Sequence, residues 1–431
     1  MNLGTVTFYF FALASTLYIL HFGFYLVGAN VYDVWQNRLR HKRFKAAIQG
    51  VTVNYKPLIT VVISAHNEEK VIVRCLESIE ASTYKNVQIL AVDDGSSDKT
   101  RLLASRYKRN HPEAYMHVLY KIKNGGKGAA LNHALKRYAK GELVMTLDAD
   151  SILRTDAIER AVAYFEDPKI VGVSANVKAI DDFTVLGMLQ KFEFMVGYRS
   201  KKVYSMVNCE FVIGGVGSTY RMSTLRKVNF YSTGTMTEDI GLSIKVVNLG
   251  NRTNRIVYGS DIVVMTEGVE KFKALVKQRF RWKYGSLQNI FRYRHLIGNT
   301  NFQEYTFSLT FYRMPLALLS EIMLLFAPIT WGYVLYWTII YASLRLVLGA
   351  YLTISIYILI TVWFDENSSI KDRLLLSMYV PIAYFIFYVM DVVQLIAVVK
   401  CLRRGHKLLR NEDSAGHWVS PTRIGHEVTA T

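Results

Sequence analysis

Two carboxylates, Asp148 and Asp150, stand one residue apart directly after the apolar run Leu143–Leu147. If that run is a strand, both side chains leave its end together and direct oxygen ligands to one point, as a hard divalent cation that bridges phosphates requires. Helix capping, the ordinary reason for Asp at such a place, does not account for the pair, because Ser151 and a loop follow. The pair therefore predicts a site for a divalent cation beside phosphate groups.

Polar residues also follow two other apolar, β-branched runs. These segments are His66–Glu69 and Asp93–Asp98, and helix capping explains Asp98 but not the whole set. Further along, Gly125–Gly128 contains three glycines and Lys127 ahead of a predicted helix, a composition that suits close approach to phosphate or a nucleotide. The segment is not a P-loop, because the Walker spacing and the final Ser or Thr are missing.

Two more segments carry groups suited to chemistry. Thr237–Asp239 opens the predicted helix Ile240–Leu249. An acidic first turn favoured by the helix dipole is one explanation, and a carboxylate acting as general base is the other. Phe211–Arg221 is a glycine-rich turn, which a ligand or a neighbouring backbone can approach closely.

A third chemical segment lies in Val269–Tyr293, a run with few helix breakers. On a helix, Gln278, Arg281 and Trp282 fall at i, i+3 and i+4 and share one face, with Arg279 pointing elsewhere. A guanidinium grips a diphosphate bidentately, and an indole ring can lie against the apolar face of a pyranose. An amphipathic surface helix is the simpler alternative.

The elements that must position these residues alternate between strand and helix. Such alternation, with strands that are apolar throughout, indicates a mostly parallel α/β sheet, whose ligands bind beyond the carboxyl ends of the strands. The predicted strands are Leu58–Ala65, Val87–Asp93, Met116–Tyr120 and Leu143–Leu147, and the predicted helices are Glu68–Ala81, Asp98–Asn110, Ala129–Tyr138 and Asp181–Ser205.

The apolar residues, 51% of the 431-residue chain, are concentrated in two blocks. Thr7–Ala29 has no charged side chain and is long enough to cross a bilayer. No positive residue precedes it and no clear cleavage site follows, so it predicts an anchor rather than a removed signal peptide. The second block, Tyr305–Lys400, predicts three or so spans, near Met314–Thr338, Ala342–Phe364 and Leu374–Val399.

The formal charge of the chain is +18, and basic residues are concentrated directly after the first predicted span. Positive loops stay in the cytoplasm, so residues 40–300 are predicted to be cytoplasmic. The basic tail after Lys400 is predicted to be cytoplasmic as well. Three crossings that start in the cytoplasm would end outside, so the total stays open at four or five spans. Anionic lipid explains the charge without nucleic acid. By their spacing, Cys75, Cys209 and Cys401 indicate neither a disulfide framework nor a zinc site. The basic residues after the span are Arg38, Arg40, Lys42, Arg43 and Lys45.

In their order along the chain, the motifs resemble those of the inverting, processive nucleotide-sugar glycosyltransferases of family 2, which have the GT-A fold. That family includes cellulose, chitin, hyaluronan and poly-N-acetylglucosamine synthases. The resemblance covers roughly residues 57–295 and implies an α/β GT-A domain, with a mixed, mostly parallel sheet, inserted between transmembrane helices. It is carried by Asp93-Asp94-Gly95-Ser96, by Asp148 and Asp150 as DxD, by Thr237-Glu238-Asp239 as TED, and by Gln278, Arg281 and Trp282 as QxxRW.

The resemblance also implies roles for single residues. Asp239, with Glu238 beside it, would be the base that deprotonates the acceptor hydroxyl. Asp150 and Asp148 would hold Mg²⁺ or Mn²⁺ and the diphosphate. The acceptor would contact Gly215, Gly217, Ser218 and Trp282, with its terminal sugar on the indole ring. The donor nucleotide would contact His66, Glu68, Asp93, Asp94, Lys127, Asp148, Gln278 and Arg281.

The tail His417–Arg423 resembles the WxSPxR ending of bacterial poly-β-1,6-N-acetylglucosamine synthases. This implies a UDP-sugar donor, UDP-N-acetylglucosamine, and a growing β-linked polysaccharide as acceptor. Gly214–Ser218 departs from the Phe-Cys-Gly-Thr of cellulose synthases, and Lys283–Gly285 departs from the Ala-Gln-Gly usual after QxxRW. Hyaluronan or chitin synthesis, transfer of one sugar to a lipid by a non-processive enzyme, and a catalytically silent membrane scaffold are the alternatives.

The resemblance places the enzyme in the plasma or inner membrane, where it would export its exopolysaccharide. Its partners would be the lipid bilayer and a small membrane accessory subunit, and no nucleic acid. Ionisable residues near the spans (Arg313, Glu321, Arg345 and Asp391) either line a polar conduit for the polymer or form structural pairs. The predicted parts are an N-terminal transmembrane helix (1–30), a basic linker (31–56), the cytoplasmic catalytic domain (57–265), interfacial helices with QxxRW (266–304), a transmembrane region (305–400) and a basic tail (401–431).

Overall fold

The computed structural model describes residues 3–48, 55–180, 184–340 and 344–409, so the His417–Arg423 motif lies outside the described residues. Within them, eight strands form one sheet in the order β3-β2-β1-β4-β7-β6-β8-β5. The strands are β1 Ile59–Ala65, β2 Val87–Asp93, β3 Met116–Tyr120, β4 Leu143–Asp148, β5 Ser151–Leu153, β6 Ile170–Ile180, β7 Ser218–Arg221 and β8 Arg255–Glu267.

The first half of the sheet is parallel, because β1 pairs in parallel with both β2 and β4, and β2 with β3. Ala65 at the end of β1 lies opposite Asp93, and Ser64 lies opposite Asp148. The acidic ends of β2 and β4 therefore lie at the same edge of the sheet, on either side of the His66 loop.

The second half of the sheet changes direction. β7 runs antiparallel to both β4 and β6, whereas β6 and β8 are parallel. β5 begins directly after Asp150 and pairs antiparallel with β8. The sheet is thus mixed and mostly parallel, as the sequence predicts, and the Asp148–Asp150 turn bridges its two halves.

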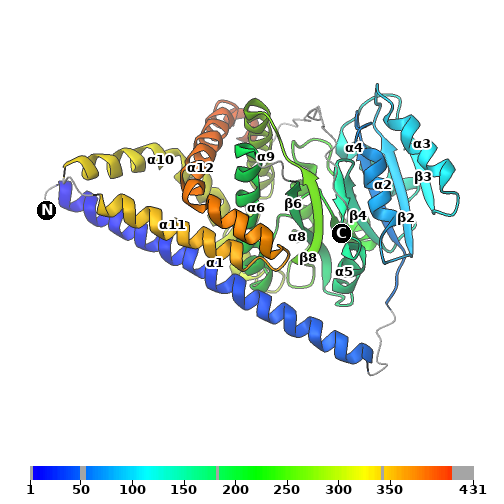
Figure 1. The fold of residues 1–431 in the computed structure, drawn as a ribbon, viewed down its shortest axis with the longest axis horizontal. Helices are drawn as coiled ribbons and strands as arrows, with labels where there is room; N and C mark the ends of the chain where they lie inside the picture. The colour runs from blue at the N-terminus through cyan, green and yellow to red at the C-terminus, as the bar shows by residue number, and fades with distance from the viewer. Residues whose placement is uncertain (1–2, 49–54, 181–183, 341–343, 410–431) are drawn as a thin grey trace.

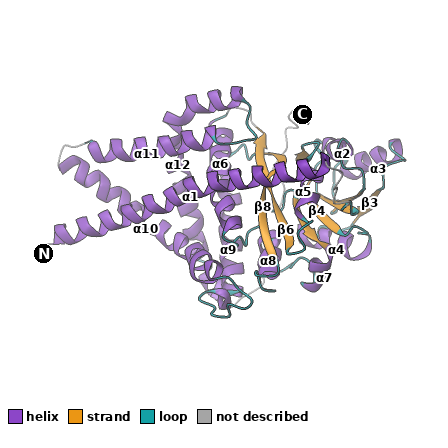
Figure 2. Ribbon diagram, turned by 90° about the horizontal axis from the view of Figure 1, so that it is seen from below, coloured by secondary structure: helices purple, strands orange, loops and turns teal. Residues whose placement is uncertain are grey.

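Helices cover both faces of the sheet (Figures 1 and 2). One face carries α2, α3 and α5, whose apolar side chains pack on Ile59, Val61 and Ile63. The other face carries α4, α7 and α8 and parts of α6 and α9, packed around Val62, Leu90 and Val144. Because both faces are covered, the strands are apolar throughout. The helices are α2 Ile72–Glu80, α3 Thr100–Asn110, α4 Lys127–Arg137, α5 Ala157–Tyr164, α6 Val185–Met206, α7 Met222–Lys227, α8 Glu238–Val247 and α9 Phe272–Arg292.

The four strands predicted from the sequence are confirmed, and helices are present at the predicted positions, although some of their ends differ. Residues Glu69–Val71 form a turn, and α2 begins only at Ile72. The delay has a physical cause: the Glu68 and Glu69 backbone N–H groups donate to Thr100 and Asp98. These contacts hold the loop open at the edge where the acidic strand ends lie.

The remaining helices lie beside the sheet domain or project from it (Figures 1 and 2). α1 (Leu3–Ile48) contains the predicted anchor Thr7–Ala29 and continues as helix through most of the predicted linker. α10 (Met314–Ile340) and α11 (Arg345–Trp363) follow one another along the chain, and α12 (Ile370–Leu402) and α13 (Gly405–Leu409) come after them. The N-terminal end of α1, the end of α10 and the start of α11 lie at the same end of the molecule, far from the sheet (Figures 1 and 2).

Two of the described helices are long and apolar enough to cross a membrane: Ser308–Ile340, which includes α10, and Ile370–Leu402, which is α12. A shorter apolar helix covers Val347–Trp363. α12 is the more enclosed of the two long helices, because it packs on α6 through Leu376 and Val380 and on α9 through Met390 and Val393. It contains Pro381, which removes one helical hydrogen bond.

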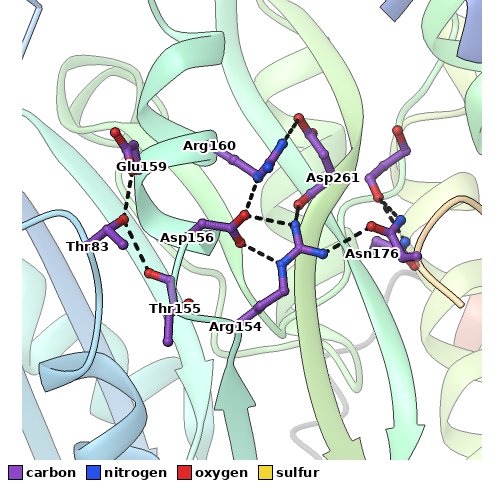
Figure 3. A network of polar contacts seen from close by, with 10 residues as sticks. Thr83, Arg154, Thr155, Asp156, Glu159, Arg160, Asn176 and Asp261 are labelled. Carbon is purple, nitrogen blue, oxygen red and sulfur yellow. Dashed lines mark hydrogen bonds and ion pairs between the residues drawn. The ribbon is translucent and has the colours of Figure 1, made fainter. Parts of the chain in front are cut away.

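The loop between α11 and α12 is fastened to the sheet domain by polar contacts. Arg154, after β5, donates to Asp156 and to the Asp261 carbonyl in β8, as Figure 3 shows. The same guanidinium donates to Asn367 of the loop at 3.1 Å, and Asn367 donates to the Ser260 carbonyl at 2.9 Å. The end of α11 therefore lies against the sheet domain.

Candidate active site

The carboxyl end of β2 forms an acidic cradle. Asp94, which is buried, accepts hydrogen bonds from Lys121 Nζ at 2.7 Å and from the Gly125 backbone N–H at 3.2 Å. Asp93 accepts from the Ser96 backbone N–H at 3.2 Å. Lys121 is not among the predicted site residues, and it links the acidic end of β2 to the Gly125–Gly128 segment.

The loop after β1 lies beside this cradle. His66 Nδ1 is 3.1 Å from the Asp94 carbonyl oxygen. Asn67 has a φ of 58°, and its side-chain oxygen accepts from the Ser97 backbone N–H at 2.8 Å. The predicted donor residues His66, Glu68, Asp93 and Asp94 thus come together, because adjacent parallel strands end at the same edge.

The predicted metal carboxylates differ in their surroundings. Asp148 is half-buried and forms an ion pair with Lys127 at the start of α4. Asp150 is 4% exposed and accepts from the hydroxyls of Ser151 and Thr266 at 3.2 and 3.3 Å. In the described part of the chain, no cluster of three or more His, Cys, Asp or Glu side chains forms a metal cage.

Two carboxylates nevertheless match one known mode of cation binding. Mg²⁺ commonly takes one or two protein carboxylates and completes its shell with substrate phosphates and water. Asp148 and Asp150 supply such a pair of hard oxygen donors. The residues fit a cation that arrives with a diphosphate better than one held by the protein alone.

The predicted catalytic carboxylates lie next to the Lys127–Asp148 pair. Lys127 Nζ is 4.0 Å from Glu238 Oε1. A Cβ placed on Gly215 would lie 2.6 Å from Lys127 Nζ and 3.5 Å from Asp239 Oδ2, so Gly215 adjoins both. Lys127, Asp148, Glu238, Asp239 and Gly215 therefore surround one place, although they come from four separate segments.

The charged side chains in this place shift one another's pKa. Burial raises the pKa of the Glu238 carboxyl, and the negative charge of Asp239 raises it further, whereas Lys127 and Arg281 oppose the shift. Burial alone would lower the pKa of the Lys127 ammonium, but Asp148, Glu238 and Asp239 together raise it. Lys127 therefore stays protonated and balances three surrounding carboxylates.

The glycine-rich turn before β7 is held at its carbonyl groups. Ser218 and Thr146 hydroxyls donate to the Gly214 and Gly215 carbonyls at 2.5 and 3.2 Å. Gly217 has a φ of 67°, and a Cβ there would lie 2.6 Å from a Val264 methyl carbon. Glycine is required at this position for both reasons. The predicted acceptor residues Gly215, Gly217 and Ser218 form one turn against the predicted catalytic carboxylates.

The QxxRW residues lie on α9. Arg281 is near enough to Glu238 to lower the pKa of its carboxyl. The expectation that Arg279 points away from the other motif residues is wrong: its guanidinium donates to Gln278 Oε1 at 2.7 Å and lies over the Trp282 ring, 4.2 Å from the ring centre. The long side chain reaches along the helix to both residues, which the position of its Cα does not reveal.

α9 is held close to the TED segment by residues that the sequence did not single out. A Cβ on Gly285 would overlap the Thr237 side chain, so the two segments approach closely. Asn289 Nδ2 donates to Thr235 Oγ1 at 3.1 Å, and Gln288 Nε2 donates to the Gly234 carbonyl at 3.1 Å. Their spacing could have revealed this contact, because Gln288 and Asn289 follow Gly285 by three and four residues and so share one side of α9 with it.

Two of the ionisable residues near the predicted spans, Glu321 and Arg313, have partners within the protein. Glu321 forms a 2.7 Å ion pair with Lys283, and the Arg313 guanidinium lies over the Tyr204 and Phe211 rings at 4.2 and 4.6 Å. For these two residues the structural-pairing explanation accounts for the burial.

The fold is that of a GT-A-type domain: a mixed sheet whose acidic strand ends lie at one edge, beside a glycine-rich turn. Residues 60–228 match the profile of Glycosyl transferase family 2.

Similar proteins agree with this assignment. A poly-beta-1,6-N-acetyl-D-glucosamine synthase from Staphylococcus aureus is 29% identical over 280 residues, which cover 64% of this chain and 65% of the relative. The protein of the same name from Staphylococcus epidermidis is 30% identical over 239 residues, or 54% and 56% of the two chains. The match thus spans less than two thirds of these relatives.

Among solved structures, the fold is similar to that of the mannosyltransferase PcManGT from Pyrobaculum calidifontis, determined in complex with GDP-Man and Mn²⁺. The TM-score is 0.53 and the identity 18%, with 88% of this chain and 99% of the other covered. At this identity the similarity concerns the fold alone.

Proposed function

We propose that this protein is a membrane-embedded polysaccharide synthase that transfers N-acetylglucosamine from UDP-N-acetylglucosamine to the end of a growing β-linked chain, with inversion. One observation carries the proposal: Asp239, Lys127, Asp148 and Gly215 converge on one place, and α9, which bears Arg281 and Trp282, approaches the TED segment closely at Gly285. The similarity to the two staphylococcal synthases supports the choice of sugar.

In the proposed reaction, the acceptor hydroxyl attacks the anomeric carbon from the side opposite to UDP. Inversion needs one base on the attacking face, and a single carboxylate suffices, unlike the two of a retaining hydrolase. We assign this role to Asp239, which adjoins the acceptor turn at Gly215. Glu238 has a raised pKa and faces Lys127, so its role is to shape the charge of the site.

The leaving diphosphate needs positive charge to balance its departure. Lys127 and Arg281 supply two cations of the protein, and Arg281 can bind two phosphate oxygens at once. Asp148 and Asp150 would hold Mg²⁺ or Mn²⁺, which when bound neutralises the diphosphate as a Lewis acid. Asp93 and Asp94 would hold the nucleoside end, as they lie in the cradle of β2.

The membrane part of the proposal rests on exposed apolar side chains. Ile329, Leu335 and Ile339 of α10 are each more than half exposed, as are Leu348 and Ile356 of α11. Apolar surface of this extent on two successive helices fits a lipid environment rather than water. We propose that α1, α10 and α11 cross the bilayer and that the sheet domain lies on its cytoplasmic side.

The course of α12 suggests a solution to the conflict over the basic tail. Its start follows the loop fastened to Arg154, and past its end Leu408 packs with Tyr284 and Leu287 of α9. Figure 1 shows α12 close to α9. We propose that α12 enters the bilayer without crossing it, so that the tail lies in the cytoplasm, as the positive-inside rule requires. We also propose that the growing polymer leaves the cell through this membrane region.

The runner-up is a non-processive enzyme that adds one sugar to a lipid phosphate. Trp282 on the motif helix favours a polymeric acceptor, because an indole offers a flat surface for a sugar ring. A silent scaffold is disfavoured by the complete set of carboxylates around Lys127. The hyaluronan and chitin alternatives differ only in the sugar and the linkage.

The decisive experiment incubates the purified full chain in lipid with Mg²⁺ or Mn²⁺ and each UDP-sugar in turn. A polymer ladder that linkage-specific β-1,6-N-acetylglucosaminidase digests would support the proposal. A single-sugar lipid product would favour the runner-up, and absence of UDP release would favour the scaffold.

Two variants test the assigned roles in the same assay. Asp239→Asn should abolish polymerisation and keep UDP binding within about twofold, because the carboxylate acts on the acceptor. Trp282→Ala should weaken acceptor use more than UDP binding. Normal polymer yield from Asp239→Asn would overturn the assignment of the base.

A further inference from the structure

Arg279 is among the most enclosed charged residues of the motif helix. Its side chain is 3% exposed and forms an ion pair with Glu193 of α6. The same guanidinium donates to Gln278 Oε1 at 2.7 Å and lies 4.2 Å from the centre of the Trp282 ring. One side chain of α9 thus contacts α6 and two of the three QxxRW residues.

Burying an arginine is costly unless a carboxylate and hydrogen-bond acceptors compensate it. Leu189 of α6 and Leu275 of α9 lie in one apolar cluster with Met390 and Val393 of α12, so both helices pack on α12. Besides linking α6 and α9, the buried guanidinium contacts two residues of the QxxRW motif.

The position of Arg279 over the Trp282 ring indicates the function of this contact. A cation on one face of an indole ring is attracted to that face and fixes the plane of the ring. Trp282 is half-buried, and Arg279 covers one of its faces. A sugar that stacks on the indole must therefore use the opposite face. The hydrogen bond to Gln278 likewise fixes the orientation of that amide.

We propose that Arg279, paired with Glu193, is a positioning residue that sets the plane of Trp282 and the amide of Gln278 for the acceptor end of the polymer. A firmly oriented ring retains the chain between successive additions, so the Arg279–Glu193 pair sets the length of the product. The inference rests on the proposed function, since it assigns a role to that acceptor site.

The test compares the parent chain with Arg279→Lys. Lysine keeps the charge for Glu193, but it lacks the planar fork that contacts Gln278 and covers the ring at once. The mean product length should fall about five- to tenfold, as expected for loss of one hydrogen bond and one cation–π contact, while the Kd for UDP changes less than about twofold. Arg226→Lys, on the exposed side of α7, is the matched control and should change neither quantity.

A second variant and a second readout protect the test against misfolding. Glu193→Gln leaves Arg279 in place and removes its counter-charge, so product length should fall less than in Arg279→Lys. The emission of Trp282, obtained as the difference from Trp282→Phe, should shift to longer wavelength in Arg279→Lys as the ring loosens.

A failure of the positioning role can be distinguished from a failure of the proposed function. A parent chain that polymerises and an Arg279→Lys variant with unchanged product length and unchanged Trp282 emission would overturn the positioning role. A parent chain that polymerises no UDP-sugar would refute the proposed function, and the Trp282 emission would still decide whether Arg279 orients the ring.

Discussion

Lys178, near the end of β6, forms a 2.9 Å ion pair with Asp365 in the loop between α11 and α12. Lys178 Nζ also lies 3.4 Å from the Ser368 hydroxyl of the same loop. The pKa of Asp365 is lowered, because Lys178 and the Ser368 hydroxyl outweigh the effect of burial. The loop is therefore tied to the sheet domain by a charged contact, and α11 must return to that side.

This contact leads to a prediction about membrane topology. In intact cells, a membrane-impermeant maleimide should label Leu344→Cys, at the far end of α11, which is 71% exposed. It should label His406→Cys in α13 only after permeabilisation, because the proposed α12 does not cross. Cys75, Cys209 and Cys401 are buried, so the parent background should be low. Labelling of His406→Cys in intact cells would instead mean that α12 spans the bilayer.

A second prediction concerns the approach of α9 to the TED segment. Gly285→Ala should strongly reduce transfer activity, because a Cβ there would lie within 2.8 Å of three Thr237 side-chain atoms. Overpacking of this kind costs about 1–3 kcal/mol and would push Arg281 away from Glu238. Gly197→Ala in α6 is the matched control, since its added methyl group would meet no other segment of the protein within 4 Å. Equal activity of both variants would show that the close approach is unimportant.

A third prediction uses the raised pKa of Glu238. A carboxyl whose folded-state pKa is raised stabilises the fold at low pH, and this contribution is lost as pH rises through the folded pKa. Glu238→Gln, which removes the titration, should therefore melt higher than the parent at pH 7–8. The difference in Tm should shrink toward pH 4. Thermal melts of both proteins at several pH values measure it, and a difference that grows on acidification would contradict the burial argument.

A fourth prediction addresses the cation. Asp150→Asn should raise the Mn²⁺ concentration that gives half-maximal activity by about 10- to 100-fold, because it removes one of two carboxylate oxygen donors. Binding of UDP without metal should change little, since Asp94 and Lys121 lie elsewhere in the cradle. Glu304→Gln, exposed and far along the chain, serves as control. An unchanged Mn²⁺ dependence in Asp150→Asn would exclude Asp150 as a ligand.

Much of the fold is predictable from the sequence, and the reasons are local. β1, β2 and β4 are recognisable because a strand covered by helices on both faces must be apolar throughout. β5 and β7 are not recognisable, because three or four residues carry no period. Their pairing depends on β8, β4 and β6, which lie far away in the chain.

The candidate site divides in the same way. Spacing predicts that Gln278, Arg281 and Trp282 share a helix face, and strand ends predict that Asp93 and Asp148 share an edge. It does not predict that Arg279 turns back to Trp282, because its partner Glu193 lies 86 residues earlier in the chain.

By itself, the sequence determined the chemical inventory: which carboxylates, glycines and cations are present, and which local elements carry them, since these follow from residue type and short-range period. Only the tertiary structure decided how α12 runs along α6 and α9 and how Lys127 comes to lie among Asp148, Glu238 and Asp239. The physical reason is that packing and ion pairing join segments whose separation along the chain carries no record of their contact.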